Sequence, residues 1–148
     1  SKKLNGDKHM VYTLCGDGEM QEGQNWEAIM FAAKQKVDNI IVTIDVNGQQ
    51  IDGSTKDIMG DYPLSAKFLA FGWDVYSMDG HDMGVIVSTL NKVKLETGKG
   101  KPIVIMMHTE MGQGVDFMMG SHKWHGIAPN DEELTKALAM LPSTFQDY

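Results

Sequence analysis

Apolar and polar residues alternate in blocks along this chain, and the blocks have two lengths. Short runs rich in Ile, Val and Met have the length and composition of buried strands; they lie at residues 10–15, 39–45, 73–78 and 102–108. Longer segments between them predict helices at residues 24–36 and 83–97, the second with apolar residues every three or four positions, and a short helix is predicted at residues 64–71 after Pro63. This alternation predicts an α/β fold, a parallel sheet with helices on both faces.

The last part of the chain is less regular. Residues 110–128 contain four glycines and have no helical period, which predicts a long functional loop or a lid. Asn130 is a good N-cap for a final helix. In that helix Leu134, Leu138 and Leu141 are predicted to face inward.

Polar residues follow the first two predicted strands directly. Gly16-Asp17-Gly18 comes after the first strand, and Asn47 comes after the second. A strand–helix–strand unit brings both strand ends to one edge of a parallel sheet, where α/β folds bind ligands. Gly16 and Gly18 have no Cβ, so a bulky anion can approach the main chain there.

The oxygen atoms at this edge suit a hard divalent cation that carries a diphosphate. Asp17 offers a carboxylate, Asn47 an amide oxygen and Gln49 a main-chain carbonyl. Two diphosphate oxygens and a water would complete the octahedron that Mg²⁺ requires, and the following helix N-terminus favours the phosphate charge. The alternative is two ordinary turns after buried strands. We prefer the metal site because of the spacing, the intervening helix and the Asn-Gly turn.

A longer string around these residues resembles a known family. The string GDGEMQEGQNWEA at residues 16–28 resembles transketolases, and DVNGQQIDG at residues 45–53 is similar to the transketolase segment after the second strand. Weaker matches follow in family order along nearly the whole chain, at residues 71–73, 79–82, 100–102, 110–115 and 124–126.

The resemblance implies thiamine diphosphate as cofactor, with Mg²⁺ or in its place Ca²⁺ or Mn²⁺. It implies that His125 reaches the cofactor diphosphate and the substrate, and that Glu22 lies at the interface between two active sites. Glu22 can also be read as a carboxylate that stabilises a helix start. The residues implied as cofactor contacts are Gly16, Asp17, Gly18, Glu19, Asn47 and His125.

The resemblance also implies a reaction and partners. The reaction is transfer of a two-carbon ketol unit from a ketose phosphate to an aldose phosphate, as in the pentose phosphate pathway. Residues 1–148 match the C-terminal part of a diphosphate-binding domain, so we expect an incomplete domain that is inactive alone. Expected partners are the remaining transketolase domains or a separate pyrimidine-binding subunit, in a dimer or heterotetramer. Alternatives are deoxyxylulose-phosphate synthase, a 2-oxoacid dehydrogenase component, and a non-catalytic subunit or remnant.

Composition narrows the class of protein. The formal charge is −7 and all 13 basic residues are Lys, which argues against a nucleic-acid partner. No apolar run is long enough to predict a membrane span. The single cysteine, Cys15, cannot form an internal disulfide and is predicted to be buried in a central strand. We therefore expect a cytoplasmic protein.

Two further features leave alternatives open. His81 follows a predicted strand end and is expected to make a structural hydrogen bond, whereas His122 and His125 share the glycine-rich loop, where zinc binding is the competing interpretation. The apolar face of the helix at 24–36 is expected either to pack on its own sheet or to be buried against other protein; it comprises Trp26, Ile29, Met30 and Ala33.

Overall fold

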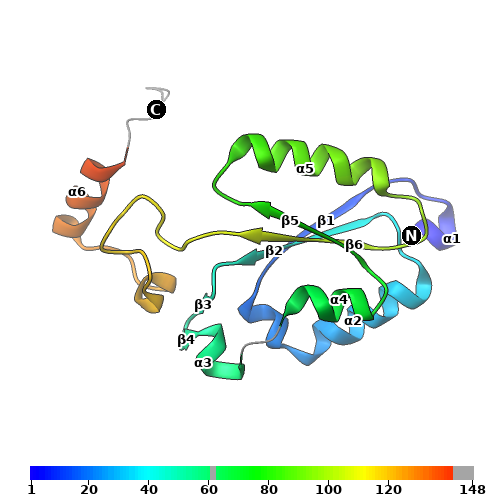
Figure 1. Ribbon diagram of the computed structural model, residues 1–148, viewed down its shortest axis with the longest axis horizontal. Coiled ribbons are helices and arrows are strands. Elements are labelled where there is room, and N and C mark those ends of the chain that lie inside the picture. The colour runs from blue at the N-terminus through cyan, green and yellow to red at the C-terminus, as the bar shows by residue number, and fades with distance from the viewer. Residues whose placement is uncertain (61–62, 142–148) are drawn as a thin grey trace.

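A four-stranded parallel sheet forms the centre of the protein, so the predicted α/β class is confirmed (Figure 1). The computed structural model describes residues 1–60 and 63–141. Every pairing in this sheet is parallel, and the order is β1-β2-β6-β5. The strands are β1 (Val11–Gly16), β2 (Ile40–Val46), β5 (Asp74–Asp79) and β6 (Ile103–His108).

Helices cover both faces of the sheet. Helices α2 (Gly23–Gln35) and α4 (Leu64–Ala70) lie on one face, and α5 (Met83–Glu96) lies on the other (Figure 1). Alternate residues of each strand point to opposite faces, so the sheet has two apolar cores. The first core centres on Ile29, Ile44, Phe68, Trp73, Val104 and Met106. The second centres on Ile41, Met78, Val93, Ile103 and Ile105.

Strand β6 is the most deeply buried element. Ile103, Val104 and Ile105 have no exposed surface, which is expected for a central strand covered on both faces. Burial of each such side chain contributes about 1.5–3 kcal/mol to folding. These contacts hold β2 and β5 on either side of β6 and therefore fix where the strands end.

The remaining elements are short and lie mostly at the carboxyl ends of the strands or beyond them. These elements are α1 (Lys2–Asn5), the 3-10 helix η1 (Gly18–Gln21), β3 (Gln49–Gln50), β4 (Gly53–Ser54), α3 (Thr55–Met59), the 3-10 helix η2 (His122–His125) and α6 (Asp131–Met140).

Within the described residues, no helix is both long enough and apolar enough to cross a membrane.

Helix α6 confirms one prediction and corrects another. Asn130 caps the helix through a reciprocal capping box with Glu133, in which the Asn130 side chain accepts from the Glu133 N–H. The inward-facing leucines were wrong: Leu134, Leu138 and Leu141 are exposed. The helix lies away from the sheet (Figure 1), so its leucines do not meet either sheet core.

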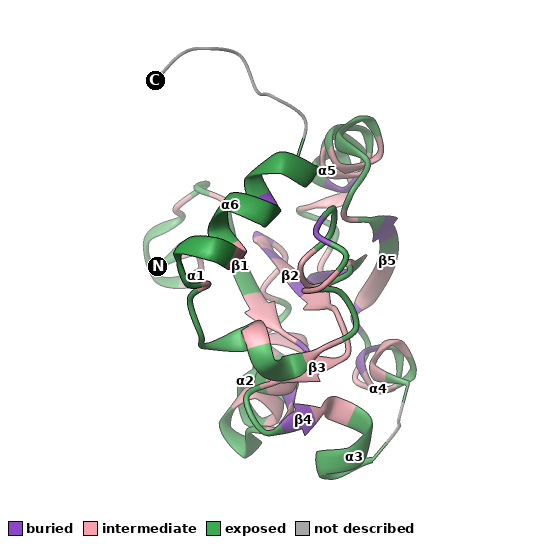
Figure 2. Ribbon diagram, turned by 90° about the vertical axis from the view of Figure 1, so that its left-hand side faces the viewer, coloured by how far each residue is buried: buried purple, intermediate pink, exposed green. Residues whose placement is uncertain are grey.

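Strand β1 is one of the two edge strands of the sheet, and it is only partly covered. On the α5 side of the sheet, Tyr12 and Leu14 are 55% and 69% exposed, because α5 packs over β5 and β6. Figure 2 shows exposed residues along β1. The prediction that Cys15 is buried in a central strand was therefore wrong: its strand is an edge strand and Cys15 is partly exposed.

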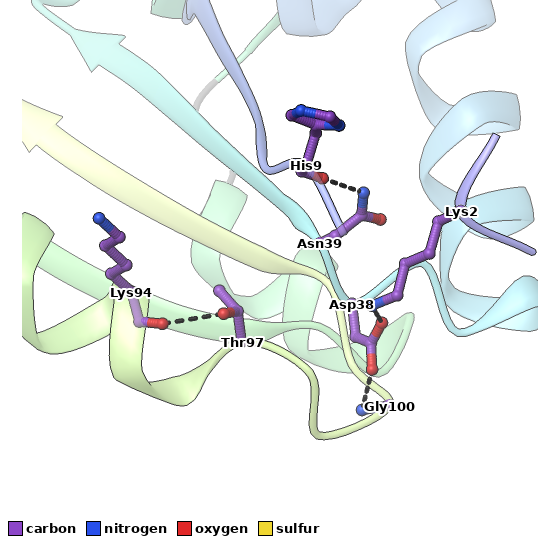
Figure 3. Close-up of polar contacts among 7 residues, drawn as sticks. All are labelled: Lys2, His9, Asp38, Asn39, Lys94, Thr97 and Gly100. Carbon is purple, nitrogen blue, oxygen red and sulfur yellow. Dashed lines mark hydrogen bonds and ion pairs between the residues drawn. The ribbon is translucent and has the colours of Figure 1, made fainter. Parts of the chain in front are cut away.

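The amino ends of the strands are closed by polar contacts among neighbouring loops (Figure 3). The Asp38 carboxylate pairs with the Lys2 ammonium and accepts a hydrogen bond from the Gly100 N–H at 2.9 Å. The Asn39 amide donates to the His9 carbonyl at 2.7 Å. These groups satisfy one another and hold together the segments at the amino ends of the strands.

Candidate functional site

The carboxyl ends of β1 and β2 bring Asp17 and Asn47 to one edge of the sheet, as predicted. In the parallel register Gly16 pairs with Asp45, so the residues that follow each strand emerge side by side. The Asp17 N–H donates to the Asp45 carbonyl at 3.0 Å and extends the ladder by one bond. The first residue beyond β1 is therefore held against β2.

The carboxylate of Asp17 is buried with one oxygen unsatisfied. The residue is 7% exposed, and its Oδ2 accepts a hydrogen bond from the Gly48 N–H at 2.8 Å. Among the residues that the structure describes, Oδ1 has no hydrogen-bond partner. Burial raises the pKa of the Asp17 carboxyl and the Asp45 charge raises it further, while the Gly48 and Gly18 N–H groups oppose the increase. A buried carboxylate oxygen without a donor is costly, and a bound cation would remove that cost.

Asn47 is held in one orientation by its neighbours. Its Nδ2 donates to Oδ2 of Asp45 at 3.2 Å, and its Oδ1 accepts from the Gln49 N–H at 2.8 Å. An amide oxygen has two lone pairs, so it can accept this bond and still ligate a cation. Gly48 adopts φ 72°, a left-handed conformation that glycine tolerates and that closes the tight turn.

In the turn after β1, a side chain already occupies the main-chain N–H of Gly16. The Glu19 carboxylate folds back and accepts a hydrogen bond from the Gly16 N–H at 2.6 Å. Gly18 lies close to Gln50, and a Cβ at Gly18 would lie 2.9 Å from the Gln50 side-chain oxygen. The glycine thus allows close packing between this turn and β3, while Glu19 as a cofactor contact stays a prediction.

Every residue predicted for the site lines one cavity of about 780 Å³. The predicted residues come from three distant parts of the chain, and the fold brings them together. Residues 16–22 start at the last residue of β1 and residues 47–49 follow β2, whereas His125 lies in η2, which packs against β3. The residues concerned are Gly16, Asp17, Gly18, Glu19, Glu22, Asn47, Gln49 and His125.

The electrostatics of the cavity favour a cation. Its walls carry carboxylates and a single imidazole, that of His125. No group of three or more His, Cys, Asp or Glu side chains in the described ranges converges as a preformed metal cage. A cation here would therefore draw ligands from Asp17, amide or main-chain oxygens, and the ligand that it carries, which is how Mg²⁺ is usually bound. The residues fit a divalent metal held together with a diphosphate.

Sequence reasoning missed Asp45 as a contributor to the site. Its carboxylate holds the Asn47 amide and also accepts the Thr109 hydroxyl, so it connects the end of β2 to the segment after β6. The available signal was a charged residue at the penultimate position of a strand that has no other charged residue. Asp52 also lines the cavity and was not predicted either.

His125 is presented by a loop with its own small core. Trp124 packs edge-to-face on Phe117, with ring centroids 5.6 Å apart, and its indole N–H donates to the Phe117 carbonyl at 3.1 Å. Val115 is buried in the same loop. The long loop predicted at residues 110–128 is therefore ordered, and it contains the short helix η2 that carries His122 and His125.

Histidines other than His125 do not line this cavity, and His81 and His108 make hydrogen bonds elsewhere. His81 Nε2 accepts a hydrogen bond from the Glu110 N–H at 2.7 Å, which confirms its predicted structural role. His108 Nε2 lies 3.0 Å from the Ser77 hydroxyl. His122 does not line the cavity, and the absence of a preformed metal cluster in the described ranges gives the zinc interpretation no support.

Known proteins match this chain in sequence. Residues 3–144 match the family described as transketolase, thiamine diphosphate binding domain. One subunit of the apulose-4-phosphate transketolase of Actinobacillus succinogenes is 41% identical over 139 residues, which cover 94% of this chain and 49% of that protein. A 6-deoxy-6-sulfo-D-fructose transketolase subunit of a Clostridium species is 42% identical over 131 residues, 88% of this chain and 47% of that protein. The chain thus spans about half the length of these curated relatives.

Solved structures match it as well. The transketolase of Campylobacter jejuni superposes with a TM-score of 0.80 at 35% identity, over 89% of this chain and 20% of that one. The transketolase of Leishmania mexicana gives 0.81 at 28% identity, over 94% and 20%. The family match at residues 3–144 covers the strands, the turns that follow them and the loop that carries His125. The chain therefore belongs to the transketolase family, within its thiamine diphosphate binding domain.

Proposed function

We propose that this chain is the diphosphate- and metal-binding part of a transketolase that transfers a two-carbon ketol unit from a ketose phosphate to an aldose phosphate. The observation that carries the proposal is the buried Oδ1 of Asp17, which has no hydrogen-bond partner among the described residues, in a cavity that the oriented amide of Asn47 also lines. In the proposal these two side chains and the Gln49 carbonyl ligate Mg²⁺, with Ca²⁺ or Mn²⁺ as substitutes.

The remaining residues bind and orient. Thiamine diphosphate supplies the carbanion chemistry when it is bound. The His125 imidazole lines the cavity, where it can donate a hydrogen bond to a phosphate oxygen and hold a proton near the substrate. Glu22 lies at the start of α2 and lines the same cavity. We propose that it faces the second active site of a dimer, where it would share protons with other carboxylates.

The rest of the enzyme is part of the proposal. Relatives that are named as one subunit of a transketolase support a partner that supplies the pyrimidine-binding half, in a dimer or heterotetramer. The partly covered β1, with Tyr12 and Leu14 exposed, is where we propose that the other half of the same subunit packs. The isolated chain is then inactive, because the site lacks the walls that these parts provide.

The test measures retention of metal and thiamine diphosphate by the full assembly. Asp17→Ala and Asn47→Ala should each weaken metal-dependent retention by at least about 100-fold, since even outer-shell partners of a metal contribute 10- to 100-fold. Asp116→Ala is the matched control, because it removes an exposed carboxylate from the loop that carries His125 and does not line the cavity. Unchanged retention in both site variants would contradict the proposal.

A further inference from the structure

The loop that carries His125 is attached to the sheet through an unusual pair of hydrogen bonds at its base. The Glu110 N–H donates to Nε2 of His81 at 2.7 Å. The carboxylate of the same residue accepts the Gly120 N–H at 2.8 Å through Oε1. Glu110 thus connects the loop after β5, through His81, to the far side of its own loop, five residues before His125.

His81 is itself held in place by its surroundings. Its main-chain N–H donates to Oδ1 of Asp79 at 2.8 Å, and the Gly80 N–H donates to the His108 carbonyl at 2.8 Å. A Cβ at Gly80 would lie 2.4 Å from the Thr109 methyl group, so only glycine lets the end of β5 approach β6 this closely. The imidazole is therefore presented to the Glu110 N–H by a tight backbone turn.

The rest of the loop packs as one unit. Val115 is buried, the Phe117 and Trp124 rings pack on each other, and the Met118 N–H donates to the Val115 carbonyl at 2.8 Å. Because the unit holds its own shape, its position over the cavity depends on the contact of η2 with β3 and on where its base is attached. The base is the end of β6 together with the hydrogen bonds from His81 to Glu110 and from Glu110 to Gly120.

We propose that His81 is a positioning residue for His125. The proposal rests on the proposed function, in which His125 contacts the cofactor diphosphate. An imidazole nitrogen that accepts a hydrogen bond carries no proton, so His81 acts as the neutral ring with its proton on Nδ1. Its Nε2 fixes the main chain at Glu110, and the Glu110 carboxylate then fixes Gly120. Together they place η2 over the cavity.

The experiment is hydrogen exchange of the loop amides in the full assembly, without metal or cofactor. His81→Phe keeps a ring and removes the acceptor. We expect exchange at the amides of Glu110 and Gly120 to rise about two- to tenfold, the factor that corresponds to one net neutral hydrogen bond. His81→Gln offers an amide oxygen in place of Nε2 and should restore slow exchange. His9→Gln, which removes an exposed imidazole away from the loop, should change neither amide.

A second measurement remains decisive if His81→Phe fails to fold. The ¹⁵N shift of His81 in the unmodified protein reports whether Nε2 carries a proton, and a protonated Nε2 at neutral pH would overturn the proposal. Unchanged exchange at Gly120 in His81→Phe, or equal effects of the Phe and Gln variants, would also overturn it. These readouts need no bound metal. Failure of the proposed function, seen as normal retention in Asp17→Ala, is therefore a separate outcome.

Discussion

Asp17 combines two opposite effects on the protein. Its buried carboxylate offers an oxygen to a cation, but the same burial raises its pKa. The ionised carboxylate is therefore unfavourable when no metal is bound. For a carboxyl whose folded pKa is raised, the folded state binds more protons than the unfolded state. Stability of the metal-free protein should therefore fall as pH rises from the unfolded pKa of about 3.8 to the higher folded value.

The raised pKa of the Asp17 carboxyl predicts the effect of replacing that group. Asp17→Asn removes the buried charge, so in metal-free buffer at neutral pH it should stabilise the fold by on the order of 1 kcal/mol. The pH dependence described above should also disappear. Urea unfolding across pH 4–8, with and without Mg²⁺, measures both effects. The unmodified protein should gain stability from Mg²⁺ and the variant should not. A variant that is less stable than the unmodified metal-free protein would contradict this.

The candidate metal ligands could be predicted from the sequence, because they lie next to glycines at the ends of predicted strands. Asp17 and Asn47 each follow an apolar run directly, and parallel pairing then brings them together. The sequence could not reveal that Glu19 folds back onto the Gly16 N–H, since that depends on a side-chain rotamer within one turn. Asp45 was missed because its role depends on hydrogen bonds to Asn47 and Thr109, the second of which lies 64 positions away.

Among the elements, long periodic segments were predictable and short ones were not. The helix predicted at 24–36 is Gly23–Gln35, and the strand predicted at 102–108 is Ile103–His108. Elements β3, β4, α3 and η2 are too short to show a period. They form where loops contact one another, as β3 contacts β4 and η2. Helix α6 misled the prediction because its leucine spacing indicates an apolar face without indicating what that face meets.

Helix α2 supports the simpler of two interpretations. Ile29 is buried, and Trp26 and Ala33 pack against the core between α2 and the sheet. Met30 remains exposed. Most of the predicted face therefore packs on its own sheet, while burial of the remainder against other protein stays a prediction.

The loop after β6 contains two glycines whose surroundings differ. Gly112 and Gly120 both adopt positive φ, 77° and 69°. A Cβ at Gly112 would lie 2.6 Å from the Met118 Cβ and 2.9 Å from its main-chain carbon, whereas nothing lies within 4 Å at Gly120. Gly120→Ala should cost only the left-handed conformation, about 1–2 kcal/mol. Gly112→Ala should cost more, because the clash is with backbone.

Protection of loop amides from hydrogen exchange, together with thermal unfolding, measures this difference. Because the two substitutions are the same chemical change at similar φ, their difference isolates the steric contact between Gly112 and Met118. Equal losses would mean that the loop relaxes around Met118 and that its packing is looser than the structure indicates.

At the scale of the whole molecule, apolar surface is left on β1. Tyr12 and Leu14 lie on this edge strand and face away from α2 and α4. An outer strand with exposed apolar side chains favours association. We predict that the chain alone self-associates, so that light scattering gives a mass well above 16.4 kDa. Leu14→Ser should reduce this association, and Leu95→Ser, which alters a comparably exposed leucine on α5, should not. A monomer of the unmodified chain would contradict the prediction.

The packing of Trp124 on Phe117 also makes the loop optically observable. The protein has three tryptophans. Trp26 and Trp73 belong to the core between α2, α4 and the sheet, and Trp124 is adjacent to His125. Subtracting the emission of a Trp124→Phe variant isolates the signal of this one indole. Stopped-flow fluorescence could then time the arrival of η2 over the cavity separately from the folding of the sheet.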